Sequence, residues 1–166
     1  DVKYFISVFA ANTNGFTSDT ISTDGITIDI QKPAVSIIAE SFEIDSSDVD
    51  WFGPSQALYI SANATDNNEV VSYEFSVGSS IGADDAVSWF ASEINNINIE
   101  IDDLSESKQY FSNVKVLDSA GNISEIFSSD GFVLDYSPPL VGIVSNGPSI
   151  TNSTKSINLS WSGFSD

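Results

Sequence analysis

Oxygen-bearing side chains are the residues of this chain that could do chemistry. The sequence holds 24 Asp and Glu residues against 5 Lys and Arg, a formal net charge of -19, and it has no Cys and no His. The missing residue types exclude thiol chemistry, zinc sites of the usual kind and any histidine-based catalytic triad. Carboxylate, amide and backbone oxygens remain, and these are the ligands that calcium prefers. The composition therefore permits one kind of site, a cation site built from oxygen ligands.

Two acidic runs need an interpretation. Asp45, Asp48 and Asp50 place three carboxylates within six residues, but the run lacks the Gly and the distal Glu of an EF-hand loop, so a solvated acidic loop is the competing interpretation. The pairs at 84–85 and 102–103 suggest a glycosidase. Adjacent residues on a strand point to opposite faces, however, so neither pair can face itself across a cleft. We expect no enzyme activity.

The charge also limits the partners. Nucleic acid binding needs clustered Lys and Arg, which this chain lacks, and anionic membrane surfaces are disfavoured for the same reason. No stretch approaches the roughly 20 apolar residues of a membrane span. Solubility and mutual repulsion along an extended molecule explain the acidity, with metal cations as the specific partner it would suit.

An internal repeat organises the chain. Tyr4 aligns with Tyr110 and Gly15 with Gly121, a shift of 106 residues without a gap, and a second shift of 99 lays residues 156–161 over 57–62. Repeats of this length predict a tandem array of domains. The other pairs related by the first shift are Phe5 and Phe111, Val8 and Val114, Asp24-Gly25 and Asp130-Gly131, Asp29 and Asp135, Pro33 and Pro139, and Val35 and Val141.

The elements between these landmarks are short strands. Period-2 alternation recurs along the chain, every break is polar with Gly, Asn, Asp or Ser, and no helical period is convincing. The sequence therefore predicts an all-β antiparallel sandwich. We expect residues 1–33 to be the last strands of one module, 34–139 a complete module, and 140–166 the first strands of a third. The two partial modules should lack most of their partner strands.

One spacing within the complete module is more specific. Leu104 precedes Tyr110 by six positions, which is typical of a tyrosine corner, where the phenol bonds backbone a few residues upstream. With this corner, the INLSW and YEFSVG strands and the LDSAGN and DYSPP segments, the chain resembles the fibronectin type III (Ig-like) superfamily, and in particular the tandem modules of large surface and adhesion proteins. The strand-B Trp of the family is present as Trp161 but is Ala62 in the complete module. We expect Trp51 or Trp89 to fill that volume.

The resemblance implies a calcium site. In the resembling modules acidic residues near the joints hold calcium, and this points to Asp118, Asn122, Asp135 and Asp29 here. The alternative is that these side chains make turn and cap hydrogen bonds. Asn12 stands where the first module would have the counterpart of Asp118, so the carboxylate set is not kept throughout the chain.

The segment 40–56 is longer than its counterpart in the third module and contains an aromatic pair. Trp51 and Phe52 could form a contact surface for a sugar or a neighbouring subunit, or fold back as a lid on the core. Four N-glycosylation sequons are a separate feature, with Asn122 on a turn and Asn152 in a loop as the best candidates. The four acceptor residues are Asn63, Asn122, Asn152 and Asn158.

These observations predict a structural repeat of a large extracellular or cell-surface protein, such as a filament, stalk or adhesin shaft. Prolines at Pro33 and at 138–139 would limit bending at the joints. The expected partners are neighbouring modules of the same chain, with identical chains in a filament or a surface glycan or protein as further candidates, and calcium is the only cofactor suggested. The alternatives are a carbohydrate- or protein-binding module that uses Trp51 and Phe52, and a polymer subunit that exchanges strands.

Overall fold

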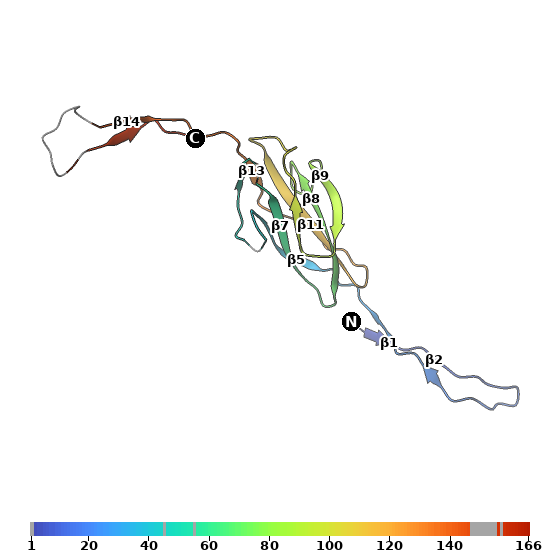
Figure 1. Ribbon diagram of the computed structural model, residues 1–166. Helices are drawn as coiled ribbons and strands as arrows, with labels where there is room; N and C mark the ends of the chain where they lie inside the picture. The colour runs from blue at the N-terminus through green and yellow to red at the C-terminus, as the bar shows by residue number, and fades with distance from the viewer. Residues whose placement is uncertain (1, 45, 55, 147–155, 157) are drawn as a thin grey trace. The chain divides into compact units, whose positions relative to one another are not determined.

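The computed structural model describes residues 2–44, 46–54, 56–146, 156 and 158–166 (Figure 1). The described residues form strands and turns, with no helix among them, as the alternating pattern predicts. None of them therefore belongs to a helix that is long and apolar enough to span a membrane. The chain divides into two compact units, Asp1–Leu134 and Asp135–Asp166.

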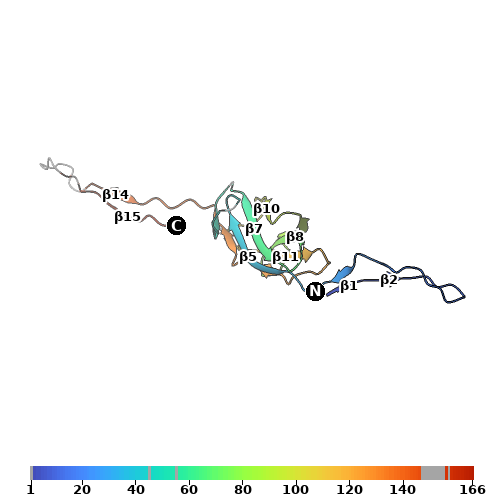
Figure 2. The ribbon, with the colours of Figure 1, turned by 90° about the horizontal axis from the view of Figure 1, so that it is seen from below.

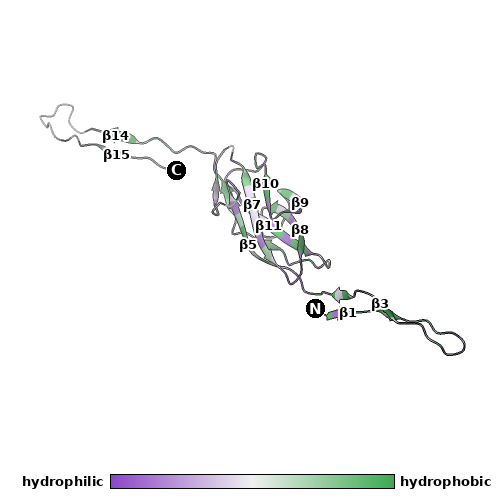
Figure 3. Ribbon diagram, turned by 60° about the horizontal axis from the view of Figure 1, so that its bottom comes forward, coloured by the Kyte–Doolittle hydropathy of each residue, from purple (hydrophilic) through white to green (hydrophobic). Residues whose placement is uncertain are grey.

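The first unit begins with a long hairpin. β1 (Val2–Tyr4) pairs with β4 (Ile26–Ile28), and β2 (Ser7–Val8) pairs with β3 (Ile21–Ser22), all antiparallel. These strands pair only with one another among the described residues, so their apolar side chains stay in solvent. Green colouring on the hairpin strands in Figure 3 marks their hydrophobic residues.

A three-stranded antiparallel sheet follows, in the order β10-β7-β5. It consists of β5 (Ala34–Ser41), β7 (Leu58–Thr65) and β10 (Asn96–Ile99), which Figure 2 shows together. Buried and less buried side chains alternate along the first half of β7, because the pleat directs successive residues to opposite faces.

A second sheet has the order β6-β13-β11-β8-β9, with β12 also paired to β11. All its pairings are antiparallel except that of β6 with β13, which is parallel. The strands are β6 (Trp51–Phe52), β8 (Val70–Gly78), β9 (Val87–Ser92), β11 (Gln109–Asp118), β12 (Phe127–Ser128) and β13 (Phe132–Leu134).

The core contains apolar side chains from both sheets, as in a β-sandwich. β7 contributes Leu58 and Ile60, and β8 and β13 contribute Phe75 and Phe132, all fully buried. The tyrosine corner is confirmed, since the Tyr110 hydroxyl accepts a 3.0 Å hydrogen bond from the Ser105 N–H while its ring lies against Phe132.

Both tryptophans lie outside this core, which corrects the expectation that one of them fills the volume beside Ala62. Trp51 is 61% exposed. Trp89 lies under the ammonium of Lys115, 4.6 Å from its ring centroid. The fully buried aromatic rings of the core are phenylalanines instead, including Phe52 of the inserted segment.

The second unit pairs β14 (Ile143–Ser145) with β15 (Ser160–Ser162). Val144 lies opposite Trp161 in this hairpin, as Ile38 lies opposite Ala62 in the three-stranded sheet. These are the positions related by the two sequence shifts. The repeat therefore has one strand register in both copies.

Candidate metal centre

Three carboxylates from distant parts of the chain converge within the first unit. Asp29 lies between β4 and β5, Asp66 directly follows β7, and Asp118 ends β11. One oxygen of each lies within 4.8 Å of the others. Calcium lies about 2.4 Å from each oxygen ligand, so one ion can contact two oxygens that are up to about 4.8 Å apart.

Asp118 is positioned by the strand and the turn after it. It continues the inward-facing row of β11 and is 1% exposed. Its Oδ1 accepts hydrogen bonds from the N–H groups of Ala120 and Asn122, both 2.8 Å, and its Oδ2 accepts one from Asn122 Nδ2, also 2.8 Å. Gly121 adopts φ +94° to close this turn, a conformation that glycine tolerates.

The same contacts decide the charge of Asp118. Burial raises its pKa, but the hydrogen bonds from Asn122, Ala120 and Gly121 together outweigh burial and hold the pKa below its ordinary value. Asp118 is therefore ionised at neutral pH.

Asp29 is held by the segment between β4 and β5 and by the turn after β7. Its Oδ1 accepts from the N–H of Gln31 at 3.0 Å and from Asn67 Nδ2 at 3.2 Å, while its Oδ2 accepts from Asn68 Nδ2. The Asp29 carbonyl also accepts from Asn122 Nδ2 at 3.3 Å. The backbone hydrogen bond of Gln31, followed by that of the Asn68 side chain, lowers the pKa of Asp29. A second ionised carboxylate thus faces Asp118.

Asp66 is the carboxylate of this cluster whose hydrogen bonding is incomplete. Its Oδ2 accepts from the N–H of Asn68 at 2.9 Å, but its Oδ1 is shielded from solvent and has no hydrogen-bond partner among the described residues. A buried acceptor without a donor costs free energy that native structures rarely tolerate. The nearest basic residue in sequence to Asp29, Lys32, pairs with Glu125 at 2.6 Å.

The structure thus brings together three of the four residues that the resemblance implied, Asp29, Asp118 and Asn122. The fourth, Asp135, lies in the second unit, where its Oδ1 accepts from the N–H of Ser137 at 3.0 Å. Asp29 makes the equivalent turn with Gln31, so turn bonding holds for both exit aspartates. The sequence analysis did not single out Asp66. The run 66–68 of acidic and amide side chains directly after a strand could have indicated it as an oxygen ligand.

Trp51 and Phe52 of the inserted segment differ: one is exposed, as a contact surface requires, and the other is folded back on the core as a lid. Phe52 is fully buried and contacts Phe42 and Phe132 edge-on, so it is a lid and not part of a contact surface. Trp51 is exposed, because neighbours on a strand point to opposite faces.

The sequons differ in accessibility. Asn63 and Asn158 are exposed. The amide of Asn122 is committed to Asp118 and Asp29, which argues against its glycosylation. Asn152 lies outside the described residues.

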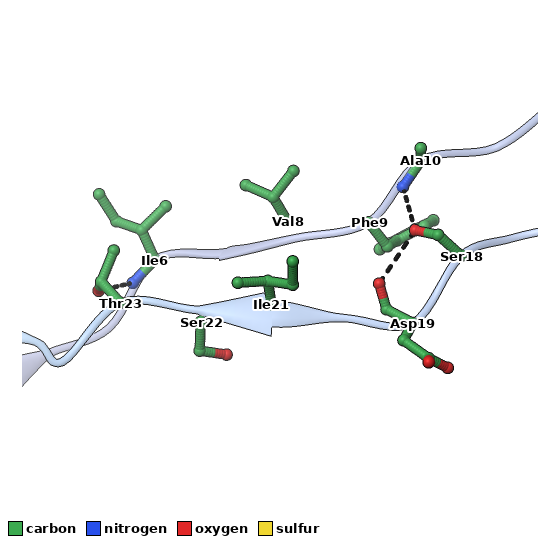
Figure 4. Close-up of a pocket in the computed structure, with 9 residues that line it drawn as sticks. All are labelled: Ile6, Val8, Phe9, Ala10, Ser18, Asp19, Ile21, Ser22 and Thr23. Carbon is green, nitrogen blue, oxygen red and sulfur yellow. Dashed lines mark hydrogen bonds between the residues drawn. The ribbon is translucent and has the colours of Figure 1, made fainter.

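A hollow of about 440 Å³ also lies on the N-terminal hairpin (Figure 4). Ile6, Val8 and Ile21 line it, and a hydrogen bond from the N–H of Ala10 to Ser18 Oγ closes one end. Strands of this one hairpin supply its lining, so we assign it to the uncovered apolar face and not to a ligand site.

Comparisons with known proteins add no assignment to this geometry: the chain matches no protein-family model, and no curated protein or solved structure shows significant similarity to it.

Proposed function

We propose that this chain is a stretch of a tandem array of fibronectin type III-like sandwiches, which gives length and rigidity to a large extracellular surface protein. The strand order supports the fold: the first, second and fifth main strands (β5, β7, β10) form one sheet, and β8, β9, β11 and β13 belong to the other. This division resembles the fibronectin type III arrangement. The tyrosine corner and the shared register of the two copies agree with it.

A shaft built in this way works through its joints. Each sandwich buries its own core, so length grows by repetition, and stiffness depends on what connects successive modules. Here Asp29 belongs to the segment leading out of the hairpin, whereas Asp66 and Asp118 belong to the sandwich. A bond shared by all three restrains the joint.

We infer that calcium forms this bond. The observation that carries the inference is the buried, unpartnered Oδ1 of Asp66, close to two carboxylates that hydrogen bonding keeps ionised. Bound calcium would supply the positive charge and the missing partner. The net charge of -19 also keeps neighbouring shafts apart.

Backbone ¹⁵N relaxation tests the proposal. In chelator the amides of β4 and β7 should report different rotational correlation times, because the hairpin reorients separately from the sandwich. In about 10 mM calcium the two values should converge, since that concentration exceeds the dissociation constants typical of extracellular modules. Asp66→Asn should prevent the convergence and the matched substitution Asp103→Asn should not. If the difference between the two correlation times is the same with and without calcium, the proposal that calcium restrains the joint is wrong.

A second candidate function rests on Trp51. Its exposed indole at the edge of the second sheet suits a carbohydrate- or protein-binding module. Titration with soluble glycans should then change its fluorescence, and Trp51→Ala should remove the response while Trp89→Phe retains it. Failure of every glycan tested to alter the emission leaves the shaft as the better account.

A further inference from the structure

The inserted segment is fastened to the sandwich by three hydrogen bonds. The N–H of Val49 donates to the Glu40 carbonyl and the N–H of Glu40 donates to Asp48 Oδ1, both at 2.8 Å. The N–H of Val133 donates to the Asp50 carbonyl at the same distance. This acidic segment is therefore held between β5 and β13.

Glu40 is the unusual residue of this region. It shares the inward face of β5 with Ile38 and is only 1% exposed. Its Oε1 accepts from Ser129 Oγ at 2.5 Å and from the N–H of Ser112 at 3.3 Å. These neutral donors leave the carboxylate without a counter-charge in the interior, an arrangement that is costly unless an ion or a proton compensates it.

A second unsatisfied group lies beside it. Ser112 is fully buried on the core face of β11, with its N–H on the Glu40 carboxylate, yet its hydroxyl makes no hydrogen bond of its own. The hydroxyl also acts on the pKa of Glu40, so it faces that carboxylate. Ser112 Oγ is thus a buried polar atom beside this carboxylate, without a hydrogen-bond partner among the described residues, and it needs a partner in the same place.

Two further carboxylates close the site from the solvent side. One oxygen each of Glu40, Asp48 and Asp130 lies within 4.8 Å of the others. Burial raises the pKa of Glu40, and burial together with the charges of Asp130 and Asp50 raises that of Asp48. The ion pairs Lys32–Glu125 and Lys115–Glu74 of the described residues involve none of these groups.

We propose that Glu40, Asp48 and Asp130 form a second calcium site, with the Ser112 hydroxyl as a further oxygen at its inner end. Oxygens that lie within 4.8 Å of one another can share one calcium ion at a calcium–oxygen distance of about 2.4 Å. The ion locks the inserted segment onto the sandwich and thereby fixes the strand that carries Trp51. The site shares no residue with the joint and stands whether or not the joint binds calcium.

Calcium titration of the chelator-treated chain by calorimetry tests the site. Asp66→Asn, which disables the joint, should still bind one calcium ion. Adding Asp130→Asn should weaken this binding by about tenfold or more, since a charged ligand is lost. The control Asp50→Asn removes a nearby charge from the same segment and should change the affinity by no more than about threefold.

Two results would overturn the proposal. One is a folded Asp66→Asn variant that binds no calcium, and the other is an equal effect of Asp130→Asn and Asp50→Asn. Cooperative unfolding in chelator checks that each variant is folded, and exposed Asp130 is chosen so that the core stays intact. Trp51 emission is the second readout and should follow the calorimetric curve. If Asp66→Asn binds no calcium, the site at Glu40 is refuted and the joint site is not. If Asp130→Asn in the otherwise native chain binds no calcium, the joint site is refuted.

Discussion

Asp66→Asn should separate the two roles of the joint cluster. The substitution keeps the shape of the side chain, removes one of three neighbouring charges, and replaces the orphan oxygen by an amide that can also donate. In chelator we therefore expect the variant to be at least as stable as the native chain. In calcium it should be less stable, because the compensating ion has lost a charged ligand.

The size of the calcium effect follows from linkage. Extracellular modules bind calcium with dissociation constants of about 10⁻⁴ to 10⁻³ M, so about 10 mM calcium is roughly 100 times the tighter value. An ion that binds only the folded state then stabilises it by about 2.7 kcal/mol. For a module of about 100 residues this raises the Tm by roughly 11–22 °C.

Thermal unfolding followed by circular dichroism measures this, with each protein scanned in chelator and in calcium. The native chain and the control Asp103→Asn should show the full rise. Asp66→Asn should retain only what the site at Glu40 contributes, and adding Asp130→Asn should reduce that remaining rise further. A full rise in Asp66→Asn would refute the reasoning from its unpartnered oxygen.

Three other predictions concern the sandwich. Tyr110→Phe leaves the N–H of Ser105 without its partner and should cost about 1–3 kcal/mol in urea unfolding. Gly131→Ala should cost roughly 2–4 kcal/mol in the same assay, because φ is +96° and the new Cβ would lie 2.7 Å from the Tyr110 carbonyl oxygen, whereas Gly82→Ala, with φ +77° and open space, should cost only about 1–2. Burial raises the folded-state pKa of Glu40 above its ordinary value, so the protonated form is favoured on folding and stability is lost as pH rises through the folded pKa. In chelator Glu40→Gln should therefore gain stability relative to the native chain from about pH 4.5 upward, and Tm values that stay parallel across pH 4 to 7 would contradict this.

Local patterns predicted the fold because the local rules and the tertiary structure agree. Alternation identified the strands, and a six-residue spacing identified the tyrosine corner. The split between Trp51 and Phe52 could have been read in the same way, since neighbours on a strand face opposite ways. Glu40 carried a signal too, because Ile38 two positions earlier marks the inward face.

The sites were harder to predict because their ligands come from separate elements. Asp66 follows β7 and Asp118 ends β11, and only sheet packing brings these strand ends together. The repeat located Asp29 but gave no sign of what it faces. Asp130 likewise meets Glu40 across the sandwich, far away in the sequence.

The N-terminal hairpin contains the same turn as the one at Asp118, but with an uncharged residue. Asn12 matches Asp118 in the repeat, and its Oδ1 accepts from the N–H groups of Asn14 and Phe16, both at 3.0 Å, as Asp118 Oδ1 does from its own turn. An amide oxygen therefore suffices to build the turn. It follows that Asp118→Asn should fold with the same turn and keep its hydrogen-exchange protection in chelator, while losing the part of the calcium-induced rise in Tm that comes from the joint. A variant that loses the turn as well would show that the charge of Asp118 is structural, and a variant that keeps the full rise would remove Asp118 from the site.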